Sequence, residues 1–480
     1  MSRKFYITTP IYYPNADLHM GHAYTTTLCD ILARYHRLMG NDVRLLSGTD
    51  DHAFKVAQAA KKQGLDPRVY VKQQGERFKA LYARLGVELD DFIQTSDEAR
   101  HWPGAIEIWK RLVAKGDLEK RAYKGLYCTG CESFKKAEDL VDGKCPDHDL
   151  VPEELEEENY FFKLFGYGDK LKNIIESNEL KIMPETRKNE ILALIERGLE
   201  DVSFSRPKKS VVWGIPVPDD PEQTMYVWCD ALTNYITSLG FGTNDDSNYR
   251  KFWPADVHMM GKDILRFHAA IWPAMLLSAN LPLPKSLFVH GFITSGGRKM
   301  SKTIGNVIDP IGIIDEYGVD ALRYFLAREI SPFEDGDFTL ERFKEAYNAN
   351  LANGLGNLAS RIMKMVETHL DRGRSSTGGP TSEEALPEEF VTLMNSYQLQ
   401  KATDYIWSEI SRLDTLIQSS EPFKLVKTEP EKAKELIQEL VINLYTIARM
   451  LNPFLPQTSD KIEAAIKANK SFAEPLFPRR

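Results

Sequence analysis

The sequence is poor in cysteine and has no long apolar run. Five cysteines among 480 residues are too few for a disulfide-stabilised secreted domain. The most apolar stretch, 269–277, is far shorter than the roughly 18 to 20 residues that span a bilayer, and it contains Pro273. The first residues lack the apolar segment of a signal peptide. These absences predict a cytoplasmic protein with no membrane partner.

Positive charge is not in excess either. The chain has 61 Lys and Arg residues against 69 Asp and Glu residues, which gives a formal net charge of -8. This balance excludes a histone-like polycation. A nucleic-acid partner would therefore have to bind a local basic surface.

The first 120 residues alternate between strand-like and helix-like segments. The predicted elements are strands at 5–9 and 43–47 and helices at 20–38 and 53–63. Such alternation is typical of an α/β domain with a parallel sheet. At roughly 100 to 200 residues per domain, the length of the chain leaves room for two or three more domains.

The segment 120–223 interrupts the alternation and is interpreted as an inserted module. It contains three of the five cysteines, an acidic run at 153–158 and a Trp- and Pro-containing stretch at 213–221. The alternation then resumes with a strand at 257–260, a helix at 264–278 and a strand at 286–290. From about residue 340 strand signals end, and long helical patterns, broken by the polar stretch 373–384, predict a separate helical domain.

His19 and His22 lie at the predicted start of the first helix. Unpaired N–H groups and the helix dipole favour anions at such a position, so a phosphate could bind there. The spacing of three places both imidazoles on one side of the helix start, and Gly21 lets a flat base or ribose approach the backbone. A pair of capping histidines without further function is the alternative interpretation.

A second polar motif, Lys-Met-Ser-Lys-Thr, occupies residues 299–303. A loop with two glycines precedes it, and Arg298, Lys299 and Lys302 concentrate three cations within five residues. Taken alone, this stretch could be a solvated turn. Together with the histidine pair, at the other end of a split α/β domain, it indicates a site for a phosphorylated ligand.

Cys128 and Cys131 form one pair with two residues between them, and Cys145 and His148 form another. Two such knuckles separated by 13 residues are typical of a tetrahedral zinc site. Four protein ligands leave no open position, so we expect one structural zinc ion per chain. Reduced cysteines that lie near a surface by chance are the alternative.

The residues at 19–22 and 299–303 resemble the His-Ile-Gly-His and Lys-Met-Ser-Lys-Ser signatures of class I aminoacyl-tRNA synthetases. Within that class, five further stretches resemble the methionyl-tRNA synthetase family; these are 8–15, 48–52, 226–232, 261–268 and 357–361. The resemblance extends from Lys4 to about Pro456. It implies an α/β fold in which a Rossmann-type parallel-sheet catalytic domain, split by a zinc-bearing connective peptide, is followed by an α-helical anticodon-binding domain.

The family's organisation supplies the expected domain boundaries. The two halves of the catalytic domain would be 1–119 and 224–297, with the connective peptide and its zinc knuckle at 120–223. The lysine loop and a stem-contact region would follow at 298–345, and the anticodon-binding domain at 346–480.

The resemblance also implies an aminoacyl-tRNA ligase. It would activate L-methionine with ATP to methionyl-adenylate and transfer methionine to the 3′-terminal adenosine of methionine tRNA, initiator and elongator. The expected catalytic residues at the triphosphate are His19, His22, Lys299 and Lys302, with Mg²⁺ accompanying ATP. Gly21 and Asp263, the second by resemblance a ribose ligand, complete the expected ATP site.

Methionine has a neutral side chain, so its selection must depend on shape, apolar contact and a polarisable contact to sulfur. By resemblance the wall of the methionine site consists of Ile11, Tyr13, Trp228, Ala231, Leu232, Tyr235, Ile264, His268 and Trp272. Asp50 would bind the α-ammonium group. Asp51 could do so as well, or it could cap the helix that begins near residue 53.

Asn357 and Arg361 are four residues apart, on one face of a predicted helix, and match the family's pair of anticodon-reading residues. The family usually has a tryptophan at the position of Phe423, on which an anticodon base stacks. A phenylalanine offers a smaller ring for the same contact.

Another class I synthetase and a non-catalytic tRNA-binding relative are the alternatives. Cysteinyl-tRNA synthetase has a zinc-binding cysteine before its histidine motif, whereas no cysteine precedes Cys29 in this chain. A tRNA-binding relative without catalysis would not need both signature motifs, and both are intact. Since no further module is visible after the helical domain, a monomer is expected.

Overall fold

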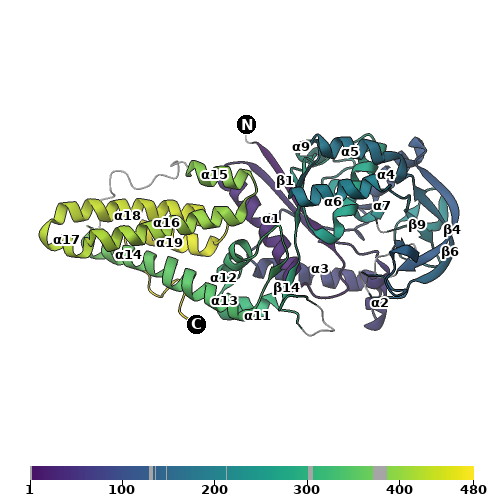
Figure 1. Ribbon diagram of the computed structural model, residues 1–480. Coiled ribbons are helices and arrows are strands. Elements are labelled where there is room, and N and C mark those ends of the chain that lie inside the picture. The colour runs from purple at the N-terminus through teal and green to yellow at the C-terminus, as the bar shows by residue number, and fades with distance from the viewer. Residues whose placement is uncertain are drawn as a thin grey trace. The chain divides into compact units, whose positions relative to one another are not determined.

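The computed structural model describes residues 3–480, apart from 129–132, 136, 147–148, 212, 227, 301–305 and 371–385. The chain divides into two compact units (Figure 1). The sheet unit consists of Met1–Leu18, Asn41–Ala80 and Glu88–His290, and the helical unit of His19–Gly40, Leu81–Val87 and Gly291–Arg480. Among the described residues, no helix is long and apolar enough to cross a membrane.

Six parallel strands form the central sheet of the sheet unit, in the order β3-β2-β1-β12-β13-β7. Their bounds are β1 (Lys4–Tyr12), β2 (Asp42–Thr49), β3 (Asp91–Gln94), β7 (Lys181–Met183), β12 (Val257–Gly261) and β13 (Ser286–His290). The predicted parallel sheet is confirmed. Strand order reverses between β1 and β12, which is where open α/β sheets bind their ligands.

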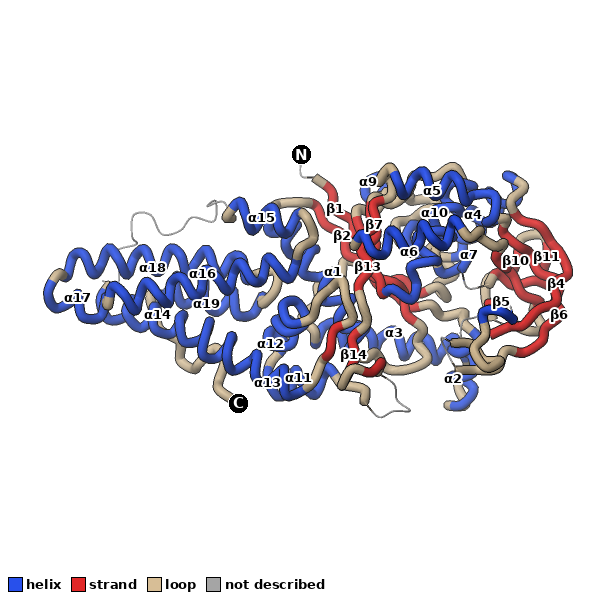
Figure 2. The backbone as a smooth tube through the Cα atoms, viewed as in Figure 1, coloured by secondary structure: helices blue, strands red, loops and turns tan. Residues whose placement is uncertain are grey.

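The core of this unit surrounds the central sheet, as expected for parallel strands covered by helices. Strand β13 is buried at every position. Helices that contribute apolar side chains to the same core are α4 (Trp102–Lys115), α5 (Gly168–Glu176), α6 (Glu185–Glu196), α8 (Asn234–Thr237) and α10 (Trp272–Ser278). Figure 2 shows these helices in blue and the strands in red. The unit also contains α2 (Phe54–Lys62), most of α3 (Pro67–Arg84), α7 (Trp228–Ala231) and α9 (Ser247–Phe252).

The predicted insertion forms two antiparallel sheets. The first has the order β5-β4-β6-β8 and the second the order β10-β11-β9. Their strands are β4 (Leu118–Cys128), β5 (Ser133–Lys135), β6 (Glu153–Phe162), β8 (Val202–Ser203), β9 (Ser205–Pro207), β10 (Pro216–Val217) and β11 (Asp220–Met225). The acidic run lies in β6, where Lys124 pairs with Glu154 at 3.1 Å and Arg206 with Glu157 at 2.7 Å.

The segment 120–223 is nevertheless not a wholly separate module. Strand β7 lies within it and pairs in parallel with β13 of the central sheet. Helices α5 and α6 flank β7, and their buried residues Leu171, Ile175 and Ile191 join the main core. Phe162 of β6 and Met225 of β11, from the antiparallel sheets, belong to the same core. The predicted boundaries therefore do not separate two independent cores.

The helical unit contains α1 (Met20–Leu38), whose bounds match the predicted helix. A small sheet, β15-β14-β16, is formed by β14 (Ile293–Ser295), β15 (Arg298–Lys299) and β16 (Gly336–Asp337). The remaining α-helices are α11 (Pro310–Tyr317), α12 (Val319–Tyr324), α13 (Leu340–Ala346), α14 (Asn357–His369), α15 (Glu388–Asn395), α16 (Leu399–Ser420), α17 (Pro422–Thr428), α18 (Pro430–Leu451) and α19 (Pro456–Ala468). The predicted helical domain is confirmed, while its polar stretch 373–384 lies outside the described residues.

The helix predicted at 264–278 is not a uniform α-helix. A 3₁₀ turn at Lys262–Ile264 and a π-helical segment at Phe267–Ile271 precede α10. Pro273 stands in the first turn of α10 and has no N–H to donate to the preceding turn. The wider π turn occurs where that α-helical hydrogen bond is missing, and it contains His268.

The guanidinium of Arg323, on α12, is fully buried in the helical unit. Its Nη2 lies 2.7 Å from Asp30 Oδ2 on α1, and the same carboxylate accepts a hydrogen bond from Arg34 Nε at 2.8 Å. The other donors of Arg323 bond to the backbone carbonyls of Leu85, Pro453 and Phe454. One buried cation therefore joins α1, α12 and the connection between α18 and α19.

Replacement of Arg323 by alanine should destabilise the helical unit severely. It would remove one ion-pair partner of the buried Asp30 carboxylate, and breaking a buried pair costs about 3 to 5 kcal/mol. Arg84→Ala is the matched control, since Arg84 pairs with Asp315 at the surface of the same unit. We expect the control to cost less than about 1 kcal/mol. Urea unfolding followed by circular dichroism measures both, and equal midpoints would contradict the prediction.

Candidate active site at the carboxyl edge of the parallel sheet

Three adjacent strands of the central sheet end beside one another. Ile11, near the end of β1, is paired with Gly48 of β2, and the N–H of Asp50 donates to the carbonyl of Tyr12 at 3.0 Å. A Cβ on Gly48 would lie 2.1 Å from the carbonyl oxygen of Ile93, so only glycine allows this approach. Asp50 is 4% exposed and therefore lies buried at the carboxyl edge of the sheet, next to β1.

Most of the predicted apolar wall belongs to the core of the sheet unit or packs against it. Leu232, Tyr235 and Trp272 belong to the main core, and Ile11, Trp228 and Ile264 pack against it. Ala231 and His268 are also buried. Tyr13 packs elsewhere, against a small cluster with Ala53, Val56, Ala60, Tyr70 and Val71. The structure thus brings six of the nine predicted wall residues to the main core and leaves Tyr13 beside a separate cluster.

Phe267 packs against the main core beside the predicted wall residue Trp228 and was not among the predicted residues. Its ring stacks on Trp228 with centroids 3.5 Å apart and planes 14° apart. The stretch 261–268 contains it between two predicted site residues, Ile264 and His268. Only the π turn places Phe267 against Trp228, and that turn is not visible in the sequence.

A hydrogen-bonded pair, Tyr235 and His268, lies at the base of this wall. The carbonyl of Ile264, 2.9 Å from Nδ1 of His268, can only accept, so Nδ1 carries the proton. Nε2 then accepts the hydroxyl of Tyr235 at 2.7 Å. Burial lowers the pKa of His268 to about 4, which keeps the ring neutral at physiological pH. The hydroxyl proton of Tyr235 is thus committed to His268.

Asp51 has a different role from its neighbour Asp50. Its carboxylate accepts a hydrogen bond from Ser96 Oγ at 2.5 Å, and its N–H donates to Thr95 Oγ1 at 2.8 Å. Burial raises its pKa. Asp51 does not cap α2, because Ala53 occupies the cap position and no side chain bonds there. The capping interpretation of Asp51 was therefore wrong.

The two histidines at the start of α1, in the helical unit, form a reciprocal cap. The N–H of Gly21 donates to Nδ1 of His19, and the N–H of His19 donates to Nδ1 of His22, each at 3.1 Å. A backbone N–H can only donate, so both Nδ1 atoms are unprotonated and both protons lie on Nε2. Burial holds the pKa of His22 well below its usual range. The capping alternative and the anion-binding interpretation are thus compatible, because capping uses Nδ1 and leaves Nε2–H as a donor.

Asp263 is exposed and lies in the turn that follows β12. A Cβ on Gly261 would meet Asp263 Oδ1 at 2.7 Å and His290 Cε1 at 3.6 Å. His290 pairs with Gly261 across the sheet and is a second residue that sequence reasoning missed. Lys299 lies in β15, whereas Lys302 lies outside the described residues.

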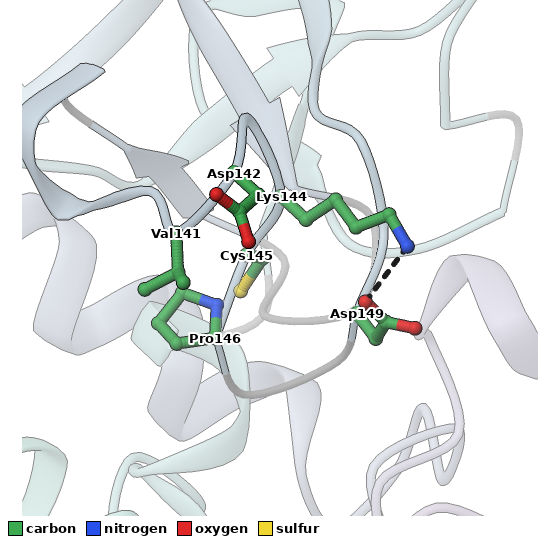
Figure 3. Close-up of a pocket in the computed structure, with 6 residues that line it drawn as sticks. All are labelled: Val141, Asp142, Lys144, Cys145, Pro146 and Asp149. Atoms are coloured by element: carbon green, nitrogen blue, oxygen red, sulfur yellow. Dashed lines mark hydrogen bonds and ion pairs between the residues drawn. The ribbon is translucent and has the colours of Figure 1, made fainter.

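Two of the four predicted zinc ligands belong to the described chain. Cys128 ends β4 and Cys145 lies in a tight turn, where the N–H of Asp149 donates to the Cys145 carbonyl at 2.8 Å; both thiols are buried. Figure 3 shows Cys145 in a pocket with Val141 and Pro146. Cys131 and His148 lie outside the described residues. Within the part of the chain that the structure describes, no three metal-binding side chains come together.

The predicted anticodon residues all lie in the helical unit. Asn357 is exposed at the first position of α14, and Arg361, one turn later, pairs with Asp414 of α16. Phe423, on α17, is 47% exposed. Trp407 is 6% exposed and packs against Tyr324, so it does not offer a free stacking surface.

Known proteins resemble this chain over nearly its whole length. The family profile described as tRNA synthetases class I (M) matches residues 5–152 and 148–363, and that of the anticodon binding domain of methionyl tRNA ligase matches 383–475. A methionine–tRNA ligase of Caldanaerobacter subterraneus is 43% identical over 96% of this chain and 74% of its own. One of Brucella melitensis is 41% identical over 99% of this chain and 95% of its own.

Solved structures show the same likeness. Mycobacterium tuberculosis methionyl-tRNA synthetase in complex with methionyl-adenylate has a TM-score of 0.91 and 36% identity, and it covers 99% of this chain and 100% of its own. The apo form of that protein has a TM-score of 0.85 and 33% identity over 100% of this chain and 99% of its own.

His268 should remain neutral down to acidic pH. Its pKa of about 4 lies below the ordinary value of 6.5, so the unfolded chain binds more protons between these values. The stabilisation is present above pH 6.5 and is lost as the pH falls through 4. Between these values, wild type should lose stability more steeply than His268→Gln, by at most about 1.4 kcal/mol per pH unit. Urea unfolding from pH 4 to 8 tests this, and parallel profiles would contradict it.

Proposed function

The chain belongs to the methionyl-tRNA synthetase family, and on this premise we propose that it activates L-methionine with ATP and charges methionine tRNA. In the first step a carboxylate oxygen of methionine attacks the α-phosphorus of ATP. The new P–O bond forms as the bond to pyrophosphate breaks, which yields methionyl-adenylate and pyrophosphate. In the second step a hydroxyl of the terminal adenosine attacks the acyl carbon, and AMP departs with the carboxylate oxygen.

The assembly at the sheet edge is the single observation that carries this function. Asp50, at the end of β2, supplies a buried negative charge beside a largely apolar wall that contains Trp228 and the Tyr235–His268 pair. A ligand that suits this site has a cationic group close to a neutral, polarisable side chain. Methionine has both features. The cysteinyl alternative and the non-catalytic alternative have neither this support nor that of the relatives' names.

Contacts to ATP follow from the histidine tautomers and from charge. His19 and His22 would donate their Nε2 protons to phosphate oxygens at the positive end of α1. Lys299 and Lys302 would stabilise the departing pyrophosphate. Gly21 would admit the nucleotide close to the backbone, and Asp263 would bind the ribose. Mg²⁺, bound with ATP, would neutralise charge on the β- and γ-phosphates.

Zinc would be held by Cys128, Cys131, Cys145 and His148. The buried thiols of Cys128 and Cys145, one at the end of a strand and one in a tight turn, support this site. Its contribution would be structural, because four protein ligands leave no position for a substrate. A cytoplasmic location and a monomeric state remain predictions.

Anticodon recognition would involve Asn357, Arg361 and Phe423. The amide and the guanidinium lie on consecutive turns of α14, where they can bond to the edges of unstacked bases. Asp414 would hold Arg361 in place through their ion pair. The exposed ring of Phe423 supports the stacking role.

Methionine alone among the twenty amino acids should support strong exchange of pyrophosphate into ATP. Asp50→Asn should raise the KM for methionine by about 100-fold, since an ammonium group that loses its buried partner costs about 3 kcal/mol. The KM for ATP should remain nearly constant and is the internal control. Strong exchange with cysteine or isoleucine would contradict the assignment, and an unchanged methionine KM would remove Asp50 from the site.

Phe423→Ala should impair charging of methionine tRNA and leave tRNA-independent exchange intact. A stacked base is worth about 1 to 3 kcal/mol, so charging should fall by roughly 5- to 150-fold in kcat/KM. Ile442→Ala is the matched control, because Ile442 is another large apolar side chain exposed in the helical unit. Normal charging by Phe423→Ala would contradict the stacking role. Loss of exchange in that variant would show that Phe423 supports the fold.

A further inference from the structure

Asp230 is a fully buried carboxylate that has no role in the proposed two-step reaction. It lies on α7, between the wall residues Trp228 and Ala231. Its Oδ2 is 2.6 Å from Nδ1 of His52, and its Oδ1 is 2.7 Å from Nε2 of His101. Both histidines are buried as well. All three residues belong to the sheet unit.

The direction of these hydrogen bonds is determined by chemistry. Burial raises the pKa of Asp230, but the two histidines outweigh burial and hold the pKa at about 2. An ionised carboxylate only accepts, so Nδ1 of His52 and Nε2 of His101 each carry a proton. In the neutral ring, Nδ1 of His101 then accepts the hydroxyl of Thr237 at 2.8 Å. The carboxylate therefore uses one oxygen for each ring.

Each ring extends this contact to a different part of the site. His52 is two residues from Asp50, and its ring packs edge-on against Trp213 with centroids 4.9 Å apart. His101 immediately precedes α4 and reaches Thr237 on α8. Helix α4 fits closely there, because a Cβ on Gly104 would lie 2.5 Å from Thr237 Cγ2. Asp230 thus connects the loop after β2 to α4, α7 and α8.

We propose that Asp230 is a positioning residue that holds the ammonium-binding and side-chain-binding halves of the methionine site in one geometry. This inference rests on the proposed function. Asp50 lies two residues before His52, which bonds to Asp230. The wall residues Trp228, Ala231 and Leu232 are within two positions of Asp230 in the sequence. The carboxylate of Asp230 bonds to His52, close to the ammonium-binding half, while its own helix α7 carries Trp228 and Ala231 of the side-chain-binding half. Movement of either half would shift the carboxylate of bound methionine relative to its ammonium anchor.

The His52 ring makes the proposal testable by a conservative change. Among the described residues, Nε2 of His52 has no hydrogen-bond partner. In Asp230→Asn the amide oxygen can still accept the hydrogen bond from Nε2 of His101. The amide NH₂ can donate to Nδ1 of His52, provided that His52 moves its proton from Nδ1 to Nε2. This move breaks no other hydrogen bond of His52 in the described part of the structure, whereas His101 is held in its tautomer by Thr237. Asparagine should therefore rescue the geometry that alanine loses.

The kinetic test compares Asp230→Ala, Asp230→Asn and Asp256→Ala in pyrophosphate exchange. Asp256 is the matched control, since it is a buried carboxylate of the same unit, bonded to Lys4 and Lys285 before the start of β12. We expect Asp230→Ala to raise the KM for methionine at least about tenfold with a much smaller effect on the KM for ATP. Asp230→Asn should lie near wild type, and Asp256→Ala should lower the melting temperature without changing the methionine KM.

Hydrogen–deuterium exchange provides a readout that does not depend on activity. In Asp230→Ala, the amides at 50–56 and at 228–239 should both lose protection, whereas Asp256→Ala should leave them unchanged. An unaltered methionine KM, or the same rise in both alanine variants, would overturn the proposal. Loss of protection at only one of the two segments would also overturn it. If methionine does not support pyrophosphate exchange by the wild type, the proposed function is wrong. The hydrogen–deuterium exchange measurement would still decide whether Asp230 joins the two segments.

Discussion

The parallel arrangement of β2, β1 and β12 is the constraint on which the site depends. Parallel strands end at the same edge, so residues that follow them meet there although they are far apart in the sequence. Asp50 follows β2, Ile11 lies near the end of β1, and Ile264 follows β12. Gly48 permits the close approach of β2 to the Ile93 backbone of β3 and to the Ile11 side chain of β1. A different strand order would scatter these residues over the surface.

Buried charge is used in this chain where elements have to be held in register. Arg323 joins three parts of the helical unit, and Asp230 joins the loop after β2 to three helices. Arg206 and Glu157 pair between the two antiparallel sheets, and the Arg206 guanidinium also lies over the Tyr127 ring at 4.1 Å. In each case the partners satisfy the charge, which is the condition for tolerating it in the interior. Such contacts are directional, whereas apolar packing alone allows several arrangements of similar energy.

In three places a hydrogen bond determines which ring nitrogen of a histidine carries the proton. At the start of α1 the backbone N–H groups place both protons on Nε2. At His268 the Ile264 carbonyl places the proton on Nδ1. At His52 and His101 the carboxylate of Asp230 selects the protonated nitrogen. The same side chain is thus a donor in one place and an acceptor in another, according to which backbone or side-chain group faces its second nitrogen.

The sequence by itself determined the features that are local. Periodicity located α1 and four of the six parallel strands, and the two signature motifs with their neighbouring stretches identified the family, because each depends on residues close together in the chain. It also supplied the predicted wall, since resemblance carries residues over one by one. Tertiary structure alone decided the rest. In the folded chain β7 pairs within the central sheet, and Tyr13 packs against a separate cluster. Phe267 stacks on Trp228, and Arg361 forms an ion pair with Asp414. The partners of Asp230 are 178 and 129 positions away, and only the folded chain brings groups so distant within hydrogen-bonding range.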